Sequence, residues 1–237
     1  MNPITNHDVA RERFLALSGL SFKDVRLLEV AFTHRSYLNE APTHPGNVAH
    51  NERLEFLGDA VLELAVTDAL YALYRDADEG ELTAYRAALV NASMLGSIAE
   101  TLGVNECLLL SKGEARDTGR ARSAILANAF EAVVGALYLD QGFAASEAFV
   151  EKHIMVRLDE VLKAGSYRDA KSQFQEFAQE KYGITPSYKT ISSEGPDHAR
   201  VFRVSVSVGD VALAEGEGQS KQEAEQSAAK KALEQKD

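Results

Sequence analysis

The chain is short of cysteine and of long apolar stretches, and each shortage excludes a class of protein. Cys107 is the only cysteine among 237 residues, so no disulfide can form within the chain. We find no apolar stretch of about 18 residues that would span a membrane. The N-terminal sequence MNPITNHDVARERF has no apolar signal core. We therefore expect a cytoplasmic protein without a membrane partner.

Several catalytic signatures are also missing. The sequence has no GxxxxGK phosphate-binding loop and no GxSxG nucleophile elbow. A di-iron helical oxidase would need Glu-x-x-His pairs on facing helices, and the sequence has none. These absences argue against an NTPase, a serine hydrolase and an oxidase. We expect no nucleotide cofactor.

Basic residues are outnumbered, and the net charge of −11 at first argues against a nucleic-acid partner. The acidity is uneven, however. Residues 1–165 hold 15 basic against 24 acidic side chains, whereas residues 166–237 hold 10 against 12. Divalent cations bound in the acidic part would reverse its local potential. The charge therefore predicts strong salt sensitivity rather than excluding nucleic acid.

The most informative stretch is NERLEFLGD, residues 51–59. Glu52, Glu55 and Asp59 are three and four residues apart, which places them on one face of a helix. The apolar residues around them predict that this face lies beside a core. Carboxylates in such a place need compensation, which a divalent cation supplies. The alternative is a surface helix whose acids face water.

A second acidic helix is predicted at ILANAFEAVVGALYLD, residues 125–140. Its Asn128 and Glu131 are three residues apart and share a face. If the two helices pack together, four oxygen donors converge. Such a ligand set suits Mg²⁺ or Mn²⁺ rather than zinc, which prefers His and Cys.

NERLEFLGDAVLELA resembles the signature helix of the ribonuclease III family, which are double-stranded RNA endonucleases. The resemblance continues through DEGELTAYRAALVN and LLLSKGEARDTGRARSAILANAFEAVVGALYLD, and covers nearly the whole chain. It implies an all-α catalytic and dimerisation domain at residues 4–163. Helical periodicity over this part is interrupted near residues 42–46, 76–80, 103 and 112–119.

The pattern changes after a short linker predicted at residues 164–168. We predict a helix at 170–182 and another at 220–234. Between them, PSYKTISSEG and the longer ARVFRVSVSVGDVALAEGEG alternate apolar and polar residues and give three strands, in the order α-β-β-β-α. Both helices should cover the single apolar face of a three-stranded sheet. This part, residues 169–236, resembles the double-stranded RNA-binding domain. The expected fold class is thus multi-domain, α followed by α+β.

The second resemblance implies which residues touch RNA. The positions that match the RNA-contacting residues of that domain are Ser172, Gln175, Glu176, His198, Ser220 and Lys221. The three residues of the first helix and His198 match contacts in two minor grooves. Ser220 and Lys221 lie at a helix N-terminus, which favours phosphate. Gln222 and Glu225 stand where lysines are common in this domain. In the first domain, the loop KGEARDTGRARS is either a solvated loop or one that brings its basic residues to phosphates.

The first resemblance implies two-metal phosphodiester hydrolysis, with Glu55, Asp59, Asn128 and Glu131 as metal ligands. Asp59 and Glu131 are the catalytic residues in this prediction, whereas Glu52 and Glu79 assist. The expected products are duplexes with 5′ phosphates and short 3′ overhangs, from ribosomal RNA precursors and structured messages. Staggered cuts need two sites and hence a homodimer. Phe56 either belongs to that dimer interface or to the monomer core.

Asn128 departs from the family pattern, which has aspartate there. An amide oxygen can ligate Mg²⁺ but adds no charge, so metal binding should be weaker. Asn128 is then a tolerated variant, a change that slows the enzyme, or a sign of a dead site. The last possibility makes the chain a non-catalytic, or attenuated, double-stranded RNA-binding protein.

Overall fold

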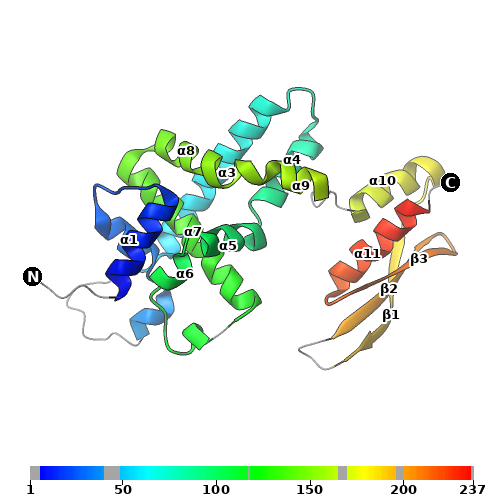
Figure 1. Ribbon diagram of the computed structural model, residues 1–237. Coiled ribbons are helices and arrows are strands. Elements are labelled where there is room, and N and C mark those ends of the chain that lie inside the picture. Colours follow the sequence, from blue (N-terminus) through cyan, green and yellow to red (C-terminus); the bar gives the residue numbers. More distant parts are fainter. Residues whose placement is uncertain (1–5, 40–48, 117, 165–169, 196–199, 236–237) are drawn as a thin grey trace, which may run out of the picture. The chain divides into compact units, whose positions relative to one another are not determined.

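The chain forms two compact units, Met1–Tyr167 and Arg168–Asp237. Figure 1 shows the computed structural model, which describes residues 6–39, 49–116, 118–164, 170–195 and 200–235. The predicted linker at 164–168 lies, beyond its first residue, outside the described residues. Each unit has its own apolar core.

The described part of the first unit is helical. Its α-helices are α1 (Asn6–Ser18), α2 (Val25–Ala31), α3 (Glu52–Leu73), α4 (Glu79–Leu89), α5 (Ala92–Thr101), α6 (Val104–Cys107), α7 (Arg120–Gln141), α8 (Phe143–His153) and α9 (Leu158–Ala164). Its 3-10 turns are η1 (Arg35–Asn39), η2 (Glu114–Arg116) and η3 (Met155–Arg157). The interruption expected near 103 falls between α5 and α6, that near 76–80 ends within the first turn of α4, and that near 112–119 contains η2. The one at 42–46 lies outside the described residues.

Helix α7 lies at the centre of this unit and packs against α2, α3, α5 and α8 (Figure 1). Its middle, residues 125–137, is buried nearly all round, as its run of apolar side chains requires. Residues 121–141 are long and apolar enough, with a mean hydropathy of 1.3, to cross a membrane by length and composition. The expectation that no such stretch occurs was therefore wrong. The position of α7 in the core accounts for its apolar character.

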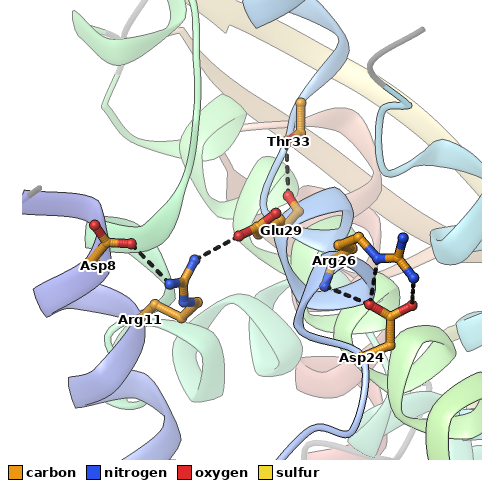
Figure 2. A network of polar contacts seen from close by, with 6 residues as sticks. All are labelled: Asp8, Arg11, Asp24, Arg26, Glu29 and Thr33. Atoms are coloured by element: carbon orange, nitrogen blue, oxygen red, sulfur yellow. Dashed lines mark hydrogen bonds and ion pairs between the residues drawn. The ribbon is translucent and has the colours of Figure 1, made fainter. Parts of the chain in front are cut away.

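The N-terminal helices are joined to each other by charged side chains (Figure 2). Arg11 of α1 donates to Asp8 at 2.9 Å and to Glu29 of α2 at 3.0 Å. The Thr33 hydroxyl donates to the main-chain oxygen of Glu29 at 2.8 Å. Asp24 caps the N-terminus of α2 by accepting from the Arg26 main-chain N–H. The Asp24 cap thus fixes the start of α2, and the Thr33 contact fixes the end that leads toward α3.

The second unit has two helices, α10 (Ala170–Tyr182) and α11 (Lys221–Glu234), and three strands, β1 (Ser187–Glu194), β2 (Val201–Val208) and β3 (Val211–Gly218). The sheet is antiparallel with the order β1-β2-β3. Val204, Val206 and Val208 are buried, and the residues between them are less buried. Their alternation places one face of β2 against the helices, with Phe174 of α10 in the core. The predicted fold class is confirmed.

Candidate functional site

The predicted acidic residues of the first unit lie on α3 and α7. Glu52, Glu55 and Asp59 occupy the first two turns of α3. Glu55 is half-buried, whereas Glu52 and Asp59 are exposed. Asn128 and Glu131 are half-buried positions within the otherwise buried middle of α7. The acids thus lie at the margin of the core, as their spacing predicts.

Two glycines let α3 and α7 come together at this point. A Cβ atom at Gly58 would overlap the main-chain oxygen of Glu131. A Cβ atom at Gly135 would overlap the main-chain oxygen of Leu54. The two backbones are therefore in direct contact, which only glycine permits. This contact brings Glu55 and Asp59 close enough to Glu131 for their charges to act on it.

Burial and neighbouring carboxylates raise the pKa of two acids in this cluster, Glu131 and Glu55. Burial first, then the charges of Asp59 and Glu55, raise the pKa of Glu131 to about 7. Burial, followed by the charges of Glu52 and Asp59, raises the pKa of Glu55. Without compensation the folded chain holds a proton on Glu131 near neutral pH. The cluster therefore resists carrying its full negative charge.

This donor set fits a divalent cation. It combines carboxylate oxygens of α3 and α7 with the amide oxygen of Asn128, the ligand atoms that Mg²⁺ prefers. Within the described residues, no three His, Cys, Asp or Glu side chains form a ready-made metal cage. The pKa shifts act over longer distances than a metal–ligand bond, so the two observations agree. Mg²⁺ does not need a closed cage, because it commonly keeps several waters.

The two assisting acids have different surroundings. Glu52 accepts from Arg35 at 3.2 Å and lies 3.7 Å from His50. It also contributes to the raised pKa of Glu55. Glu79 is exposed at the start of α4 and does not contribute to the pKa shifts of Glu55 or Glu131. The structure therefore brings Glu52, but not Glu79, to the cluster.

Phe56 is not part of the monomer core, because 81% of its surface is exposed. Leu64 and Tyr71 of the same helix are 57% and 72% exposed. Phe56 and Leu64 are eight positions apart, and Leu64 and Tyr71 are seven apart. Each pair is therefore separated by about two turns on one side of the helix. We call these three residues the apolar stripe of α3. It runs beside the acidic residues of the same helix, since Glu52 and Phe56 are one turn apart.

The predicted RNA-contacting residues of the second unit lie on its two helices. Ser172, Gln175 and Glu176 are exposed on α10. Gln175 and Glu176 border a shallow depression together with Gln179 and Glu180. His198 lies outside the described residues. The exposed side of α10 is thus polar and open to a ligand.

The N-terminus of α11 is already capped. The Ser220 hydroxyl accepts from the Glu223 main-chain N–H at 3.1 Å, and Glu223 accepts from the Gln219 N–H at 2.9 Å. Lys221 is exposed beside this cap. Glu225 pairs with Lys171 of α10 at 2.7 Å. This pair explains why an acid stands where the related domains have lysine, since Glu225 joins the two helices.

Comparisons with known proteins assign both units. The family model "Ribonuclease-III-like" matches residues 24–158, and the model "Double-stranded RNA binding motif" matches residues 170–236. The chain belongs to the ribonuclease III family. The predicted family, and the endonuclease activity on double-stranded RNA that defines it, are confirmed. Nucleases of the ribonuclease III family depend on divalent metal ions.

Relatives cover almost the whole of this ribonuclease III chain. The Ribonuclease 3 of Leptospira interrogans is 44% identical over 212 residues, or 90% of this chain and 85% of the relative. The Ribonuclease 3 of Oleidesulfovibrio alaskensis is 46% identical over 213 residues, or 90% and 92% of the two chains. A crystal structure of the nuclease domain of Campylobacter jejuni ribonuclease III is 34% identical, with a TM-score of 0.55, over 66% of this chain and 97% of that one. Another structure of that nuclease domain, which shows flexibility in a region involved in dimer formation, has 36% identity and a TM-score of 0.53, over 61% and 98%.

Sequence reasoning missed two of the residues that build this ribonuclease III site. Gly58 and Gly135 hold no ligand, yet they permit the contact between α3 and α7. The signal was present, because an isolated glycine inside a helical pattern often marks a close packing contact.

Proposed function

We propose that this ribonuclease III cuts double-stranded RNA at the cluster where α3 crosses α7. Glu55, Asp59, Asn128 and Glu131 would hold Mg²⁺, with Mn²⁺ able to substitute. The observation that carries this proposal is the backbone contact at Gly58, which brings acids of two helices together. When bound, divalent cations activate water and stabilise the leaving 3′ oxygen.

The chain's own residues have distinct roles in this proposal. Glu131 holds a proton near neutral pH in the metal-free protein, so cation binding must release it. Asp59 is exposed at the edge of the cluster, where it can reach both the cation and an RNA phosphate. The Asn128 amide oxygen would help to orient the cation without adding charge to the ligand set. We assign Asp59 and Glu131 as the catalytic residues.

The active form in this proposal is a homodimer. The apolar stripe of α3 exposes Phe56, Leu64 and Tyr71, and a second copy would cover it. Because the stripe lies beside the acids, a twofold dimer places two cutting sites near its interface. Two sites on opposite strands would leave 5′ phosphates and short 3′ overhangs. The Campylobacter jejuni nuclease domain, which has a region involved in dimer formation, supports this arrangement.

The second unit would bind the duplex by shape. Its proposed contacts are Ser172, Gln175, Glu176, His198, Ser220 and Lys221. Recognition of A-form RNA depends on ribose hydroxyls and phosphates more than on bases. Ribosomal RNA precursors and structured messages in the cytoplasm are the proposed substrates. We propose the domain bounds 4–163 and 169–236, with the linker at 164–168.

The decisive experiment is cleavage of a long perfect RNA duplex over a Mg²⁺ series, with EDTA as the metal-free reference. Glu131→Ala should abolish cutting, because it removes the most buried carboxylate of the cluster. Glu151→Ala, at an exposed acid on α8, is the matched control and should cut normally. Cutting that survives in Glu131→Ala would contradict the site.

Asn128 supports a second candidate function, a non-catalytic or attenuated RNA-binding protein. The neutral amide lowers the ligand charge, and affinity for hard cations follows ligand charge. Asn128→Asp should lower the Mg²⁺ concentration needed for cutting. An unchanged Mg²⁺ requirement would remove Asn128 from the ligand set. If neither version cuts while both bind duplex, the second candidate is correct.

A further inference from the structure

A polar pocket of about 570 Å³ lies at the N-terminal end of α7. Helix α5 forms one wall and the first turn of α7 forms another, with Asn105 of α6 between them. The two walls meet at Gly96, where an added Cβ would lie 2.7 Å from the Ser123 hydroxyl oxygen. The proposed metal ligands do not line this pocket. It is therefore a separate feature of the first unit.

Arg122 gives the pocket a fixed positive group. Its Nε donates to the Asn105 side-chain oxygen at 2.8 Å, which holds the guanidinium in place. Its Nη1 is buried and has no hydrogen-bond partner among the described residues. Leaving a buried charged donor without an acceptor is costly. Nη1 itself is closed off from the pocket, but the Arg122 side chain lines it, and a planar guanidinium matches phosphate particularly well.

The surrounding groups also favour an anion beside Arg122. Helix α7 begins after Gly119 with no side-chain cap and with no acid in its first turn. Both Gly119 and Ser123 line the pocket, so the positive end of the 22-residue helix borders it. Ser93 and Ser97 add hydroxyl donors from the α5 wall. The donors thus come from two helices and converge on one space.

An acidic residue, Glu100, also lines the pocket. Its carboxylate lies on the same wall as the serines and would repel an isolated phosphate. It would accept hydrogen bonds from hydroxyl or amino groups carried by the same ligand. A ribonucleotide has both parts, since its phosphate is joined to a ribose and a base. The pocket volume falls within the usual range for small ligands.

We propose that this pocket binds one ribonucleotide unit, with its phosphate against Arg122 and its hydroxyl or amino donors toward Glu100. The unit comes either from a free nucleoside monophosphate or from the 5′-phosphorylated end of an RNA chain. The inference goes beyond the proposed nuclease function, because it requires neither metal nor cleavage.

The test is a calorimetric titration of the full chain with uridine 5′-monophosphate in EDTA. Saturable binding is expected, and Arg122→Gln should weaken it at least about tenfold, since it removes a charge-assisted bond. Ser97→Glu is a second variant on an exposed position of α5, and its carboxylate should repel the phosphate to a similar extent. Arg26→Gln removes an exposed arginine far along the chain and should leave binding unchanged.

A second arm identifies the source of the ribonucleotide. Short RNA duplexes with a 5′ phosphate and with a 5′ hydroxyl are compared in EDTA. A preference for the phosphorylated end that Arg122→Gln abolishes assigns the pocket to RNA ends, whereas binding of the monophosphate alone assigns it to free nucleotide. The proposal is overturned if neither probe binds, or if Arg122→Gln and Ser97→Glu bind both probes like the wild type. No cleavage occurs in EDTA, so this result and the nuclease assay fail independently.

Discussion

Glu131 combines two demands that conflict within one residue. It lies on the most buried helix of the first unit, yet its proposed role needs an ionised carboxylate. Burial and the charges of Asp59 and Glu55 raise its pKa to about 7. In the metal-free protein, loss of the Glu131 proton therefore lowers the folding stability.

This effect predicts how stability changes with pH in the metal-free protein. The folded pKa lies above the ordinary value of 4.5, so between these values the folded state binds more protons than the unfolded state. Stability should fall as the pH rises from 5 to 8, on the order of 1 kcal/mol after allowing for solvent screening. Urea unfolding in EDTA measures it. Glu131→Gln should lose less stability over the same range, and identical slopes would contradict the assignment.

Cys107 illustrates a residue whose environment suppresses its chemistry. Burial, and then the charge of Glu106, raise the pKa of its thiol to about 12, with Arg11 acting in the opposite direction. Only the thiolate is nucleophilic, so iodoacetamide at pH 8 should react with folded protein far more slowly than with protein in urea. Mass spectrometry follows the modification. Equal rates in both solvents would contradict the burial of this thiol.

At the scale of elements, the contact between α3 and α7 decides whether the cluster forms. The sequence predicted both acidic helices and the shared face of each, because helical spacing follows directly from residue order. It did not predict their distance, because that depends on Gly58 and Gly135 meeting across the chain. The sequence offered the loop that contains Arg122 as a candidate for phosphate binding, but it did not predict the pocket, whose walls meet where Gly96 lies against Ser123. From the sequence, Glu225 was recognised only as an acid at a position where lysine is common. Its role in pairing was not predicted, because its partner Lys171 lies 54 positions away.

Gly58→Ala should therefore separate the two helices. The new methyl group overlaps the main-chain oxygen of Glu131, which cannot rotate away as a side chain would. We expect a loss of about 1–3 kcal/mol in unfolding free energy and weaker Mg²⁺ binding. Gly80→Ala, in the exposed first turn of α4, is the control and should cost little. Urea unfolding and a Mg²⁺ titration of thermal stability give both values. Wild-type stability in Gly58→Ala would show that the helices do not touch.

At the scale of the whole molecule, the apolar stripe of α3 is a surface of large exposed apolar side chains. Phe56→Asp should give a folded monomer at micromolar concentration, because a charge cannot be buried in an apolar interface without a large cost. Light scattering with size-exclusion chromatography measures the mass. Val211→Asp alters a similarly exposed apolar residue of the second unit and should leave the mass unchanged. A dimer of unchanged affinity in Phe56→Asp would place the interface elsewhere.

The position of acidic and apolar residues on one helix also has a geometric consequence. Helix α3 is a rigid rod, and Phe56 and Asp59 are separated by a fixed rise of about 1.5 Å per residue. In the proposed dimer this rod sets the distance from the twofold axis to each cutting site. The geometry of the protein would then set the length of the overhang. The overhang length should remain constant from one RNA to another, even where the position of the cut changes.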